Sequence, residues 1–407
     1  MVVNIRKQYN MTFCILSALT IIMVVAGHIG YGVLTVGELF PYYSFHVPLF
    51  MFISGYFYQD REEEQLGAYI KKKVCRLLIP YYIWNLVYGL FAGMMHSFGF
   101  AMGERIGFKT LVLDPFLHGY QFIYNYAAWF VPVLFVVEVM NILARMILKR
   151  LTAWTAALSG RMDRHGDGEE RKPDRERIVE WVMLTGSLLV GIVVVWLATK
   201  GKVWGYYKAP GRILFLFPCF QMGQFYCKRL ERHDTLGNLP YFAIVIGIQA
   251  LLNICCHGLA YSTVWCTGYA NGPLIPYVTV VTGIAFWLRI ARVLEPAFRD
   301  SRAVRYLGRN TYAVMMHHVM AFMLIKMVIA GAAAAIGCFG DLEWAELYTN
   351  IDYFYLVGGE EHFKMVYLAA GVLIPLMIQY GLSRLTGWPP LARRAERIRG
   401  WLGRRAE

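Results

Sequence analysis

Ten apolar segments, each long enough to cross a lipid bilayer as a helix, recur along this chain of 407 residues. A helix rises about 1.5 Å per residue, so a span of the hydrocarbon core needs about 20 mostly apolar residues. The predicted spans are residues 11–30, 41–58, 75–95, 127–148, 178–198, 211–228, 239–257, 273–291, 305–327 and 364–385. The sequence therefore predicts an all-α, polytopic membrane helical bundle with about ten transmembrane helices.

The composition agrees with a membrane protein, since 57% of the residues are hydrophobic and only 16% are charged. The formal net charge of +13 raises the alternative of a nucleic-acid-binding protein. The basic residues, however, stand at the ends of apolar segments and form no single basic face. We expect membrane lipids, and no nucleic acid, among the partners.

Lysine and arginine gather in alternate loops, and this pattern predicts the orientation of the chain. The loops after the second, fourth, sixth and eighth predicted spans, and the C-terminus, are rich in one or both of these residues. Residues 29–40 and 258–272 contain neither, and residues 338–363 are acidic. Only the loop 199–210, with three lysines, opposes the pattern. Both termini are therefore expected in the cytoplasm.

A polar stretch, residues 159–177, interrupts the chain between the fourth and fifth predicted spans. We expect it to be a flexible cytoplasmic linker inside a single transmembrane domain, residues 1–390, which a basic cytoplasmic tail, residues 391–407, follows. No P-loop and no Gly-x-Gly-x-x-Gly element is present, so nothing in the sequence indicates nucleotide hydrolysis.

Four residues of metal-ligating types cluster near the predicted outer face, at Cys255, Cys256, His257 and Cys266. They leave open a disulfide, with Cys338 as a further candidate partner, or a metal site. Their spacing fits no zinc pattern, and cysteine is a common buried hydrophobic residue. A structural role is favoured, and no metal is expected.

Two histidines on apolar segments, His28 and His46, are joined by a connection that contains no Lys or Arg. If the flanking segments are spans, both imidazoles lie near the same membrane face. Ionisable residues inside membrane segments are usually functional, although a histidine at a helix end can also be satisfied by headgroups or a backbone carbonyl. The pair is the first candidate for a reaction centre.

The sequence around these histidines resembles the family-3 membrane acyltransferases. In that family a histidine in the first helix precedes a segment like residues 45–56 here, Phe-His-Val-Pro-Leu-Phe-Met-Phe-Ile-Ser-Gly-Tyr. Further matches are residues 73–81, 128–132 and 306–312, together with His318. The resemblance covers most of the chain, from about residue 10 to residue 385, and its motifs are specific as a set.

The resemblance implies an enzyme of the bacterial inner membrane that passes an acetyl or other short acyl group to a hydroxyl of an extracytoplasmic glycan. Acyl-coenzyme A is the implied donor substrate, and no bound cofactor is expected. The family's catalytic histidine corresponds to His28. One departure is Ser17, which stands where the family usually has an arginine eleven residues before that histidine.

Chemistry assigns a role to His28, because a sugar hydroxyl needs a base before it can attack a thioester, and imidazole titrates near neutral pH. General base catalysis is favoured over an acyl-histidine intermediate. His46 is expected to orient a partner or to cap the second helix. His318 matches a family position, whereas His317 points to another helix face and is expected to be structural.

The remaining candidates are substrate-binding residues, each with a structural alternative. Lys73 and Arg76 are expected to hold the nucleotide phosphates of the donor, or else to pair with lipid phosphates. Trp129 lines an acyl pocket, or else belongs to an interfacial aromatic belt. Ser54, next to Gly55, binds substrate or marks close helix packing, and packing is favoured. The acidic loop 338–363, rich in aromatic residues, contacts a carbohydrate or acts as a lid.

A carrier or flippase for a polar metabolite or a lipid-linked sugar is the alternative from another class, with the histidines in a proton relay. Proton-coupled carriers often use buried carboxylates, and only Glu138 and Glu180 approach the predicted spans, which favours the enzyme. A third alternative, a catalytically silent homologue, follows from Ser17.

Overall fold

The protein is described by a computed structural model, which covers residues 10–32, 39–117, 122–158, 171–259 and 269–386. Within these ranges every regular element is a helix and no strand occurs. The α-helices are α1 (Met11–His28), α2 (His46–Tyr56), α3 (Leu66–Lys73), α4 (Ile79–Ser97), α5 (Asp114–Leu117), α6 (Phe130–Leu158), α7 (Arg171–Thr199), α8 (Lys208–Phe225), α9 (Asn238–Cys256), α10 (Ile275–Phe298), α11 (Arg302–Arg309), α12 (Thr311–Ile336), α13 (Trp344–Thr349) and α14 (Lys364–Thr386).

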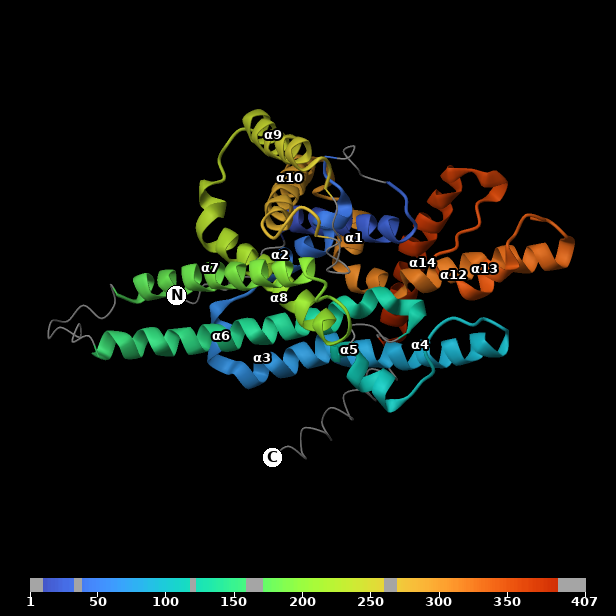
Figure 1. Ribbon diagram of the computed structural model, residues 1–407, viewed down its shortest axis with the longest axis horizontal. Coiled ribbons are helices and arrows are strands. Elements are labelled where there is room, and N and C mark those ends of the chain that lie inside the picture. The colour runs from blue at the N-terminus through green and yellow to red at the C-terminus, as the bar shows by residue number, and fades with distance from the viewer. Residues whose placement is uncertain (1–9, 33–38, 118–121, 159–170, 260–268, 387–407) are drawn as a thin grey trace.

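Local sequence explains where several helices begin and continue. The side chain of Asn10 accepts a hydrogen bond from the backbone N–H of Phe13 and caps the start of α1. A π-helical stretch, Val74–Leu78, joins α3 to α4, so the two form one long rod (Figure 1). The helices α4, α6, α7 and α12 run along the long axis, with α9 and α10 at one edge.

In the described ranges, eight helical stretches are long and apolar enough to cross a membrane, which confirms the polytopic helical bundle. They are Met11–His28, Asp60–Ser97, Ile123–Thr155, Arg175–Thr199, Asn238–Cys256, Ile275–Phe298, Thr311–Ile336 and Glu361–Leu385, and each overlaps a predicted span. The termini, residues 1–9 and 387–407, lie outside the described residues, so their cytoplasmic location stays a prediction.

Two predicted spans, 41–58 and 211–228, are not among the eight. They form α2 and α8. α2 has only 11 residues, about half the number that a bilayer span needs. α8 carries Lys208, Arg212 and two buried glutamines. Both helices pack inside the bundle, where neighbouring helices rather than lipid surround them, so neither needs a continuous apolar surface.

Backbone-to-backbone contact between α2 and α8 depends on two glycines. A Cβ atom on Gly55 would lie 1.9 Å from the carbonyl oxygen of Phe220, and one on Gly223 would lie 2.0 Å from the carbonyl oxygen of Phe52. Small residues permit this approach between membrane helices. The close packing expected near Ser54 and Gly55 is thus confirmed at Gly55.

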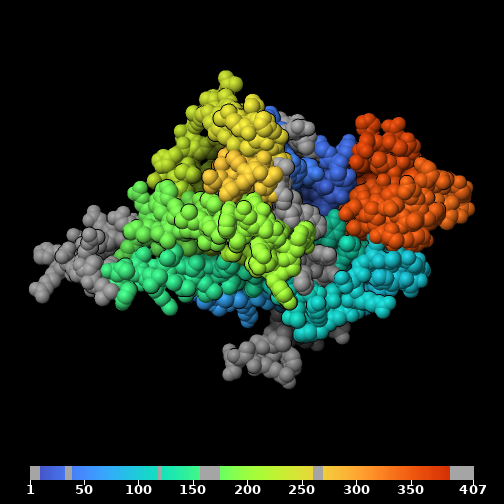
Figure 2. Space-filling view, in the orientation of Figure 1, coloured from blue at the N-terminus to red at the C-terminus, as the bar shows by residue number. Residues whose placement is uncertain are grey.

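Several basic side chains from the predicted cytoplasmic loops form ion pairs with acidic side chains of the bundle. Arg145 is fully buried and donates hydrogen bonds to Asp60 at 2.8 Å and Glu63 at 2.7 Å. Lys228 pairs with Asp60 at 2.6 Å and with Glu180 at 3.3 Å. The predicted linker 159–177 lies partly outside the described residues, and its last seven residues begin α7. In the space-filling view α6 and α7, both green, lie side by side (Figure 2).

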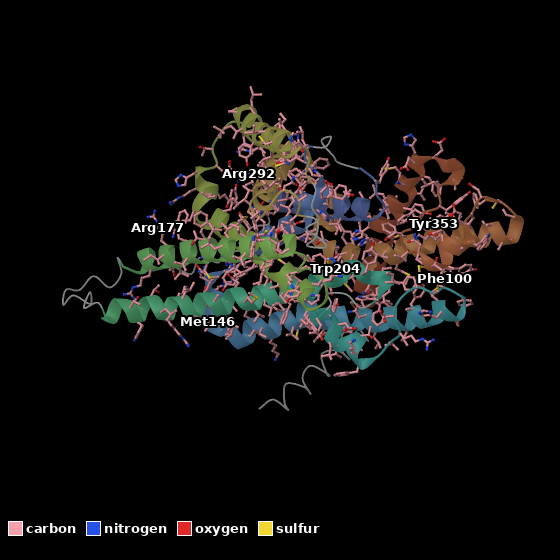
Figure 3. All side chains as sticks on the ribbon, in the orientation of Figure 1. Phe100, Met146, Arg177, Trp204, Arg292 and Tyr353 are labelled. Carbon is pink, nitrogen blue, oxygen red and sulfur yellow. The ribbon has the colours of Figure 1, made fainter. Side chains whose placement is uncertain are left out.

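At the opposite end of the long axis, loops pack together near the ends of α4 and α12. The backbone N–H of Ala101 donates to the carbonyl oxygen of Tyr348 at 3.0 Å, which ties the segment after α4 to α13. Phe100 and Tyr353 are both labelled at this end, and Arg177 lies at the other (Figure 3). A hydrogen bond to Asp341 fastens Tyr355 in the acidic loop and raises the pKa of Tyr355 to about 12. The predicted acidic loop is therefore a folded part of this end.

The cysteine cluster gives no metal site within the described residues. Cys255, Cys256 and Cys338 are free thiols, and no group of three or more His, Cys, Asp or Glu side chains that could hold a metal ion occurs in the described ranges. Cys266 lies outside the described residues.

Candidate active site

The C-terminal end of α1 meets the middle of α12 and brings two histidines together. The ring centroids of His28 and His318 lie 4.8 Å apart, at an interplanar angle of 63°. The ring of Tyr126, which precedes α6, lies 5.3 Å from that of His28. His318 is fully buried and His28 partly buried, so the His28 ring faces the inside of the bundle.

Hydrogen bonds to the backbone determine the proton arrangement on these rings. Nδ1 of His28 lies 2.7 Å from the carbonyl oxygen of Val24, and Nδ1 of His318 lies 2.8 Å from that of Val314. A carbonyl oxygen can only accept, so Nδ1 carries the proton and Nε2 is the acceptor of the neutral ring. Nε2 of His318 is buried without a hydrogen-bond partner among the described residues.

His46 shares a pocket with His28. We call it the histidine pocket; its lining residues are Ile21, Val24, His28, His46, Val47, Phe50, Ala127, Trp129, Phe130 and Met315. His46 is 3% exposed, and its Nδ1 lies 2.5 Å from the carbonyl oxygen of Tyr42. His28 and His46, which the sequence paired, thus line one shared, mostly apolar pocket.

Trp129 forms one wall of the histidine pocket and is only 5% exposed. That burial is unlike an interfacial belt tryptophan, whose ring borders lipid headgroups. The guanidinium carbon of Arg212, on α8, lies 4.1 Å from the Trp129 ring centroid, a cation–π contact. The pocket has a volume of about 30 Å³, room for one or two water molecules.

The other predicted residues, Ser54, Lys73 and Arg76, line a second pocket with a volume of about 270 Å³. We call it the basic pocket; its remaining lining residues are Ile53, Phe57, Tyr58, Gln59, Glu62, Tyr69, Lys72 and Glu138. Lys73 pairs with the buried carboxylate of Glu138. Arg76 is exposed and has no hydrogen-bond or ion-pair partner among the described residues. The hydroxyl of Ser54 donates to Phe50 at 2.9 Å.

The helix α2 runs between the two pockets. Phe50 borders the histidine pocket, and Ile53, three residues further on, borders the basic pocket, about 4.5 Å along the helix axis. No described residue lines both pockets. The seven predicted site residues therefore form two groups, about one helical turn apart at their closest approach along α2.

Several residues of this region were absent from the sequence-based predictions. The hydroxyl of Tyr126 donates to Asp352 at 3.3 Å. Lys326, 2% exposed on α12, bonds the carbonyl oxygen of Ile351 and lies 4.4 Å from the Phe354 ring centroid. A lysine at the end of the predicted span 305–327 was the one available signal. Nothing in the sequence connects Asp352 with Tyr126, more than 200 positions away.

Two further residues behave as the sequence indicates. His317 lies on another face of α12, where its Nδ1 is 2.7 Å from the hydroxyl of Tyr88, and its ring packs 4.2 Å from that of Trp84. The hydroxyl of Ser17 donates to the carbonyl oxygen of Phe13 at 2.8 Å. α1 itself carries no lysine or arginine.

Comparison with protein families gives one match over most of the chain. A family model described as an acyltransferase domain matches residues 15–339. This range includes the histidine pocket and the basic pocket and ends before Asp352. Comparison with curated proteins and with solved structures gives no match.

Proposed function

The chain belongs to acyltransferase family 3, and from this premise we propose that it moves an acetyl or other short acyl group from acyl-coenzyme A to a hydroxyl of an extracytoplasmic glycan. It is a multi-pass membrane acyltransferase. Four parts of this function are proposals: the donor, the acceptor, the location in the bacterial inner membrane and the role of His28. Family membership favours the enzyme over the carrier or flippase.

The observation that carries the mechanism is the tautomer of His28 in the histidine pocket. With Nδ1–H bound to Val24, Nε2 of the neutral ring holds a lone pair that can take a proton. His28 removes the proton of the acceptor hydroxyl while the oxygen attacks the thioester carbonyl carbon. The C–O bond forms, the C–S bond breaks, and the coenzyme A thiolate leaves with the proton from the imidazolium.

His318 and His46 are proposed to position this base rather than to replace it. Nε2 of His318 has no partner among the described residues, and its ring packs against that of His28. A second neutral imidazole there holds the His28 ring without adding a charge next to it. His46 contributes a second polar edge to a pocket whose other walls are mostly apolar, and Trp129 supplies an apolar wall for the acyl group.

The donor's phosphates are proposed to bind in the basic pocket. Arg76 has a free guanidinium there, and Lys72 and Lys73 add two cations, while Glu62 and Glu138 neutralise part of that charge. Guanidinium groups bind phosphates through paired hydrogen bonds. The pantetheine arm would then follow α2 for the one turn that separates the pockets, and side chains between Phe50 and Ile53 must move to let it pass.

Replacing Arg76 with glutamine tests this donor site. The KM for acyl-coenzyme A is expected to rise about 10-fold, because one charge-assisted hydrogen bond to a phosphate contributes about 1.5 kcal/mol. The order of preference among acceptors should not change. Lys71→Gln is the matched control, since Lys71 is exposed in α3 and does not line the pocket. Equal KM values for wild type and Arg76→Gln would contradict the assignment.

The acceptor is proposed to approach from the loop end, past Tyr126 and Asp352. A carboxylate that accepts hydrogen bonds and an aromatic ring beside it suit a sugar. Asp352 is exposed and already accepts from Tyr126, whose ring contacts His28. These contacts support an acceptor path that ends at the base.

Asp352→Asn is expected to raise the KM for the glycan acceptor about 5-fold, since about 1 kcal/mol separates a charged from a neutral hydrogen-bond acceptor. Hydrolysis of the donor in the absence of acceptor should stay at the wild-type rate. Steady-state rates over a range of acceptor concentrations measure the first, and release of free thiol measures the second. A lower donor hydrolysis rate with an unchanged acceptor KM would place Asp352 in the donor path instead.

The function itself is tested with purified protein, radiolabelled acyl-coenzyme A and isolated envelope glycans. Label in the glycan supports the proposal. Wild-type protein that binds the donor and transfers no label to any glycan would favour the silent homologue, for which Ser17 is the reason.

A further inference from the structure

A third cavity lies away from both pockets, between the α7–α8 pair and the α9–α10 pair. Its volume is about 450 Å³, larger than either the histidine pocket or the basic pocket. Its walls are apolar and include Phe52, Leu184, Phe225, Ile284, Ala285 and Leu288. We call it the apolar pocket. The proposed reaction does not use it.

Each of the four helices α7, α8, α9 and α10 contributes residues to the apolar pocket. Leu184 is in the first half of α7, Phe225 ends α8, Tyr241 is in the first turn of α9, and Leu288 is in the second half of α10. The loop-charge pattern assigns each of these helix ends to the cytoplasmic side. The pocket therefore lies at the depth of the cytoplasmic leaflet.

The rim of the apolar pocket is polar and carries arginines. Asp234, at the rim, accepts from Arg289 at 2.5 Å and from Arg292 at 2.6 Å, and Arg292 is labelled on α10 in Figure 3. Nε of Arg289 is buried without a partner among the described residues. Arg232, next to the rim residue His233, is exposed; its Nε donates to Nε2 of His233 at 3.0 Å, and it forms no ion pair within the described part of the chain. The rim thus has cationic groups that are not fully neutralised.

We propose that the apolar pocket binds one acyl chain of an anionic phospholipid, with the phosphate of the headgroup at Arg232. An apolar cavity beside a cationic rim matches a molecule with a hydrocarbon chain and a phosphate. A membrane phospholipid is the occupant because the cavity lies at leaflet depth, where such lipids surround the helices. The site is independent of the proposed acyl transfer.

The headgroup of the lipid, rather than its acyl chain, is expected to determine which phospholipid the apolar pocket binds. A hydrocarbon chain gains little hydrophobic free energy when it leaves other lipid chains for an apolar pocket, so the chain supplies shape and dispersion contacts only. The headgroup supplies the preference, because one arginine near an anionic headgroup contributes about 1 kcal/mol. That free energy corresponds to a preference of about 5-fold for phosphatidylglycerol over phosphatidylcholine.

The test is native mass spectrometry of the full chain after exchange into mixed micelles of phosphatidylglycerol and phosphatidylcholine. Wild type should retain one phosphatidylglycerol molecule. Ala285→Phe should lose it, because the added ring fills the pocket. Val193→Phe is the control: Val193 is 53% exposed on α7, outside the pocket, and this variant should keep the lipid.

Arg232→Gln is a second variant, and its substitution lies outside the lining of the apolar pocket. It tests the proposal if Ala285→Phe does not fold. It should keep a bound lipid and lose the preference for phosphatidylglycerol. Retention of the lipid by folded Ala285→Phe, an unchanged preference in Arg232→Gln, or binding of a long-chain acyl-coenzyme A in place of phospholipid would each overturn the proposal.

Discussion

Replacing His28 with alanine is expected to lower kcat for acyl transfer about 10²- to 10⁴-fold, the range that a positioned general base contributes. The loss corresponds to about 3–5 kcal/mol of transition-state stabilisation. Binding of acyl-coenzyme A should change little, because the basic pocket lies one helical turn of α2 away from the histidine pocket. Single-turnover transfer of radiolabel to the glycan measures the rate, and equilibrium binding of the donor measures its affinity.

His362→Ala is the matched control for this substitution. His362 is exposed in the loop before α14 and lines neither pocket, so its loss should leave the rate within about twofold. A His28→Ala enzyme that keeps the wild-type rate would remove the mechanism proposed above. Label that stays bound to the wild-type protein in the absence of acceptor, and is absent from His28→Ala, would replace general base catalysis with an acyl-histidine route.

Replacing Gly55 with alanine is expected to have the largest effect on stability. The new Cβ would lie 1.9 Å from the carbonyl oxygen of Phe220, so α2 and α8 must separate at the centre of the bundle. Overpacking costs about 1–3 kcal/mol where side chains can adjust. Here the obstacle is backbone, so we expect the free energy of unfolding to fall by about 3 kcal/mol or more. Thermal unfolding in detergent, followed by size-exclusion chromatography, measures the loss.

Two comparisons make the Gly55 result specific. Gly186 and Gly247 lie inside α7 and α9 with open space where a Cβ would be built, so alanine there should be neutral or slightly stabilising. Gly223→Ala should destabilise like Gly55→Ala, since its Cβ would meet Phe52. The double variant should lose less than the sum, because the first substitution has already separated the helices. A Gly55→Ala protein as stable as wild type would mean that the two backbones are not in contact.

The two substitutions together separate the reaction from its scaffold. His28 lies at the end of α1 and makes one backbone hydrogen bond within its own helix, so its loss should alter the chemistry and leave the bundle intact. Gly55 carries no functional group, and its loss should lower activity only in proportion to the fraction of unfolded protein.

Sequence reasoning identified the chemically important segments because they carry local signals. Apolar length predicted ten helical segments, and each of them contains an α-helix in the structure, since a span needs about 20 apolar residues wherever it lies in the chain. Apolar content does not, however, distinguish a helix that faces lipid from one that other helices surround, as they surround α2 and α8. The motif around His46 lies at the histidine pocket, and Lys72, Lys73 and Arg76 lie at the basic pocket.

The arrangement of the site depended on contacts between distant residues, which no local pattern records. Trp129 reads as a belt tryptophan in sequence, and only the packing of α8 and its Arg212 against the ring makes it a buried wall. The contact of His28 with His318 joins residues 290 positions apart, and that of Tyr126 with Asp352 joins residues 226 apart.

The sequence by itself determined that this chain is a helical membrane protein, which segments form its helices, and which family it resembles, because hydropathy and short motifs are properties of neighbouring residues. Only the tertiary structure decided that the seven predicted residues form two groups, at two pockets on either side of one turn of α2. It also decided that two glycines let α2 and α8 touch and that a third, apolar cavity exists. Side-chain burial and helix separation depend on which elements pack together, and that choice is made by the whole chain.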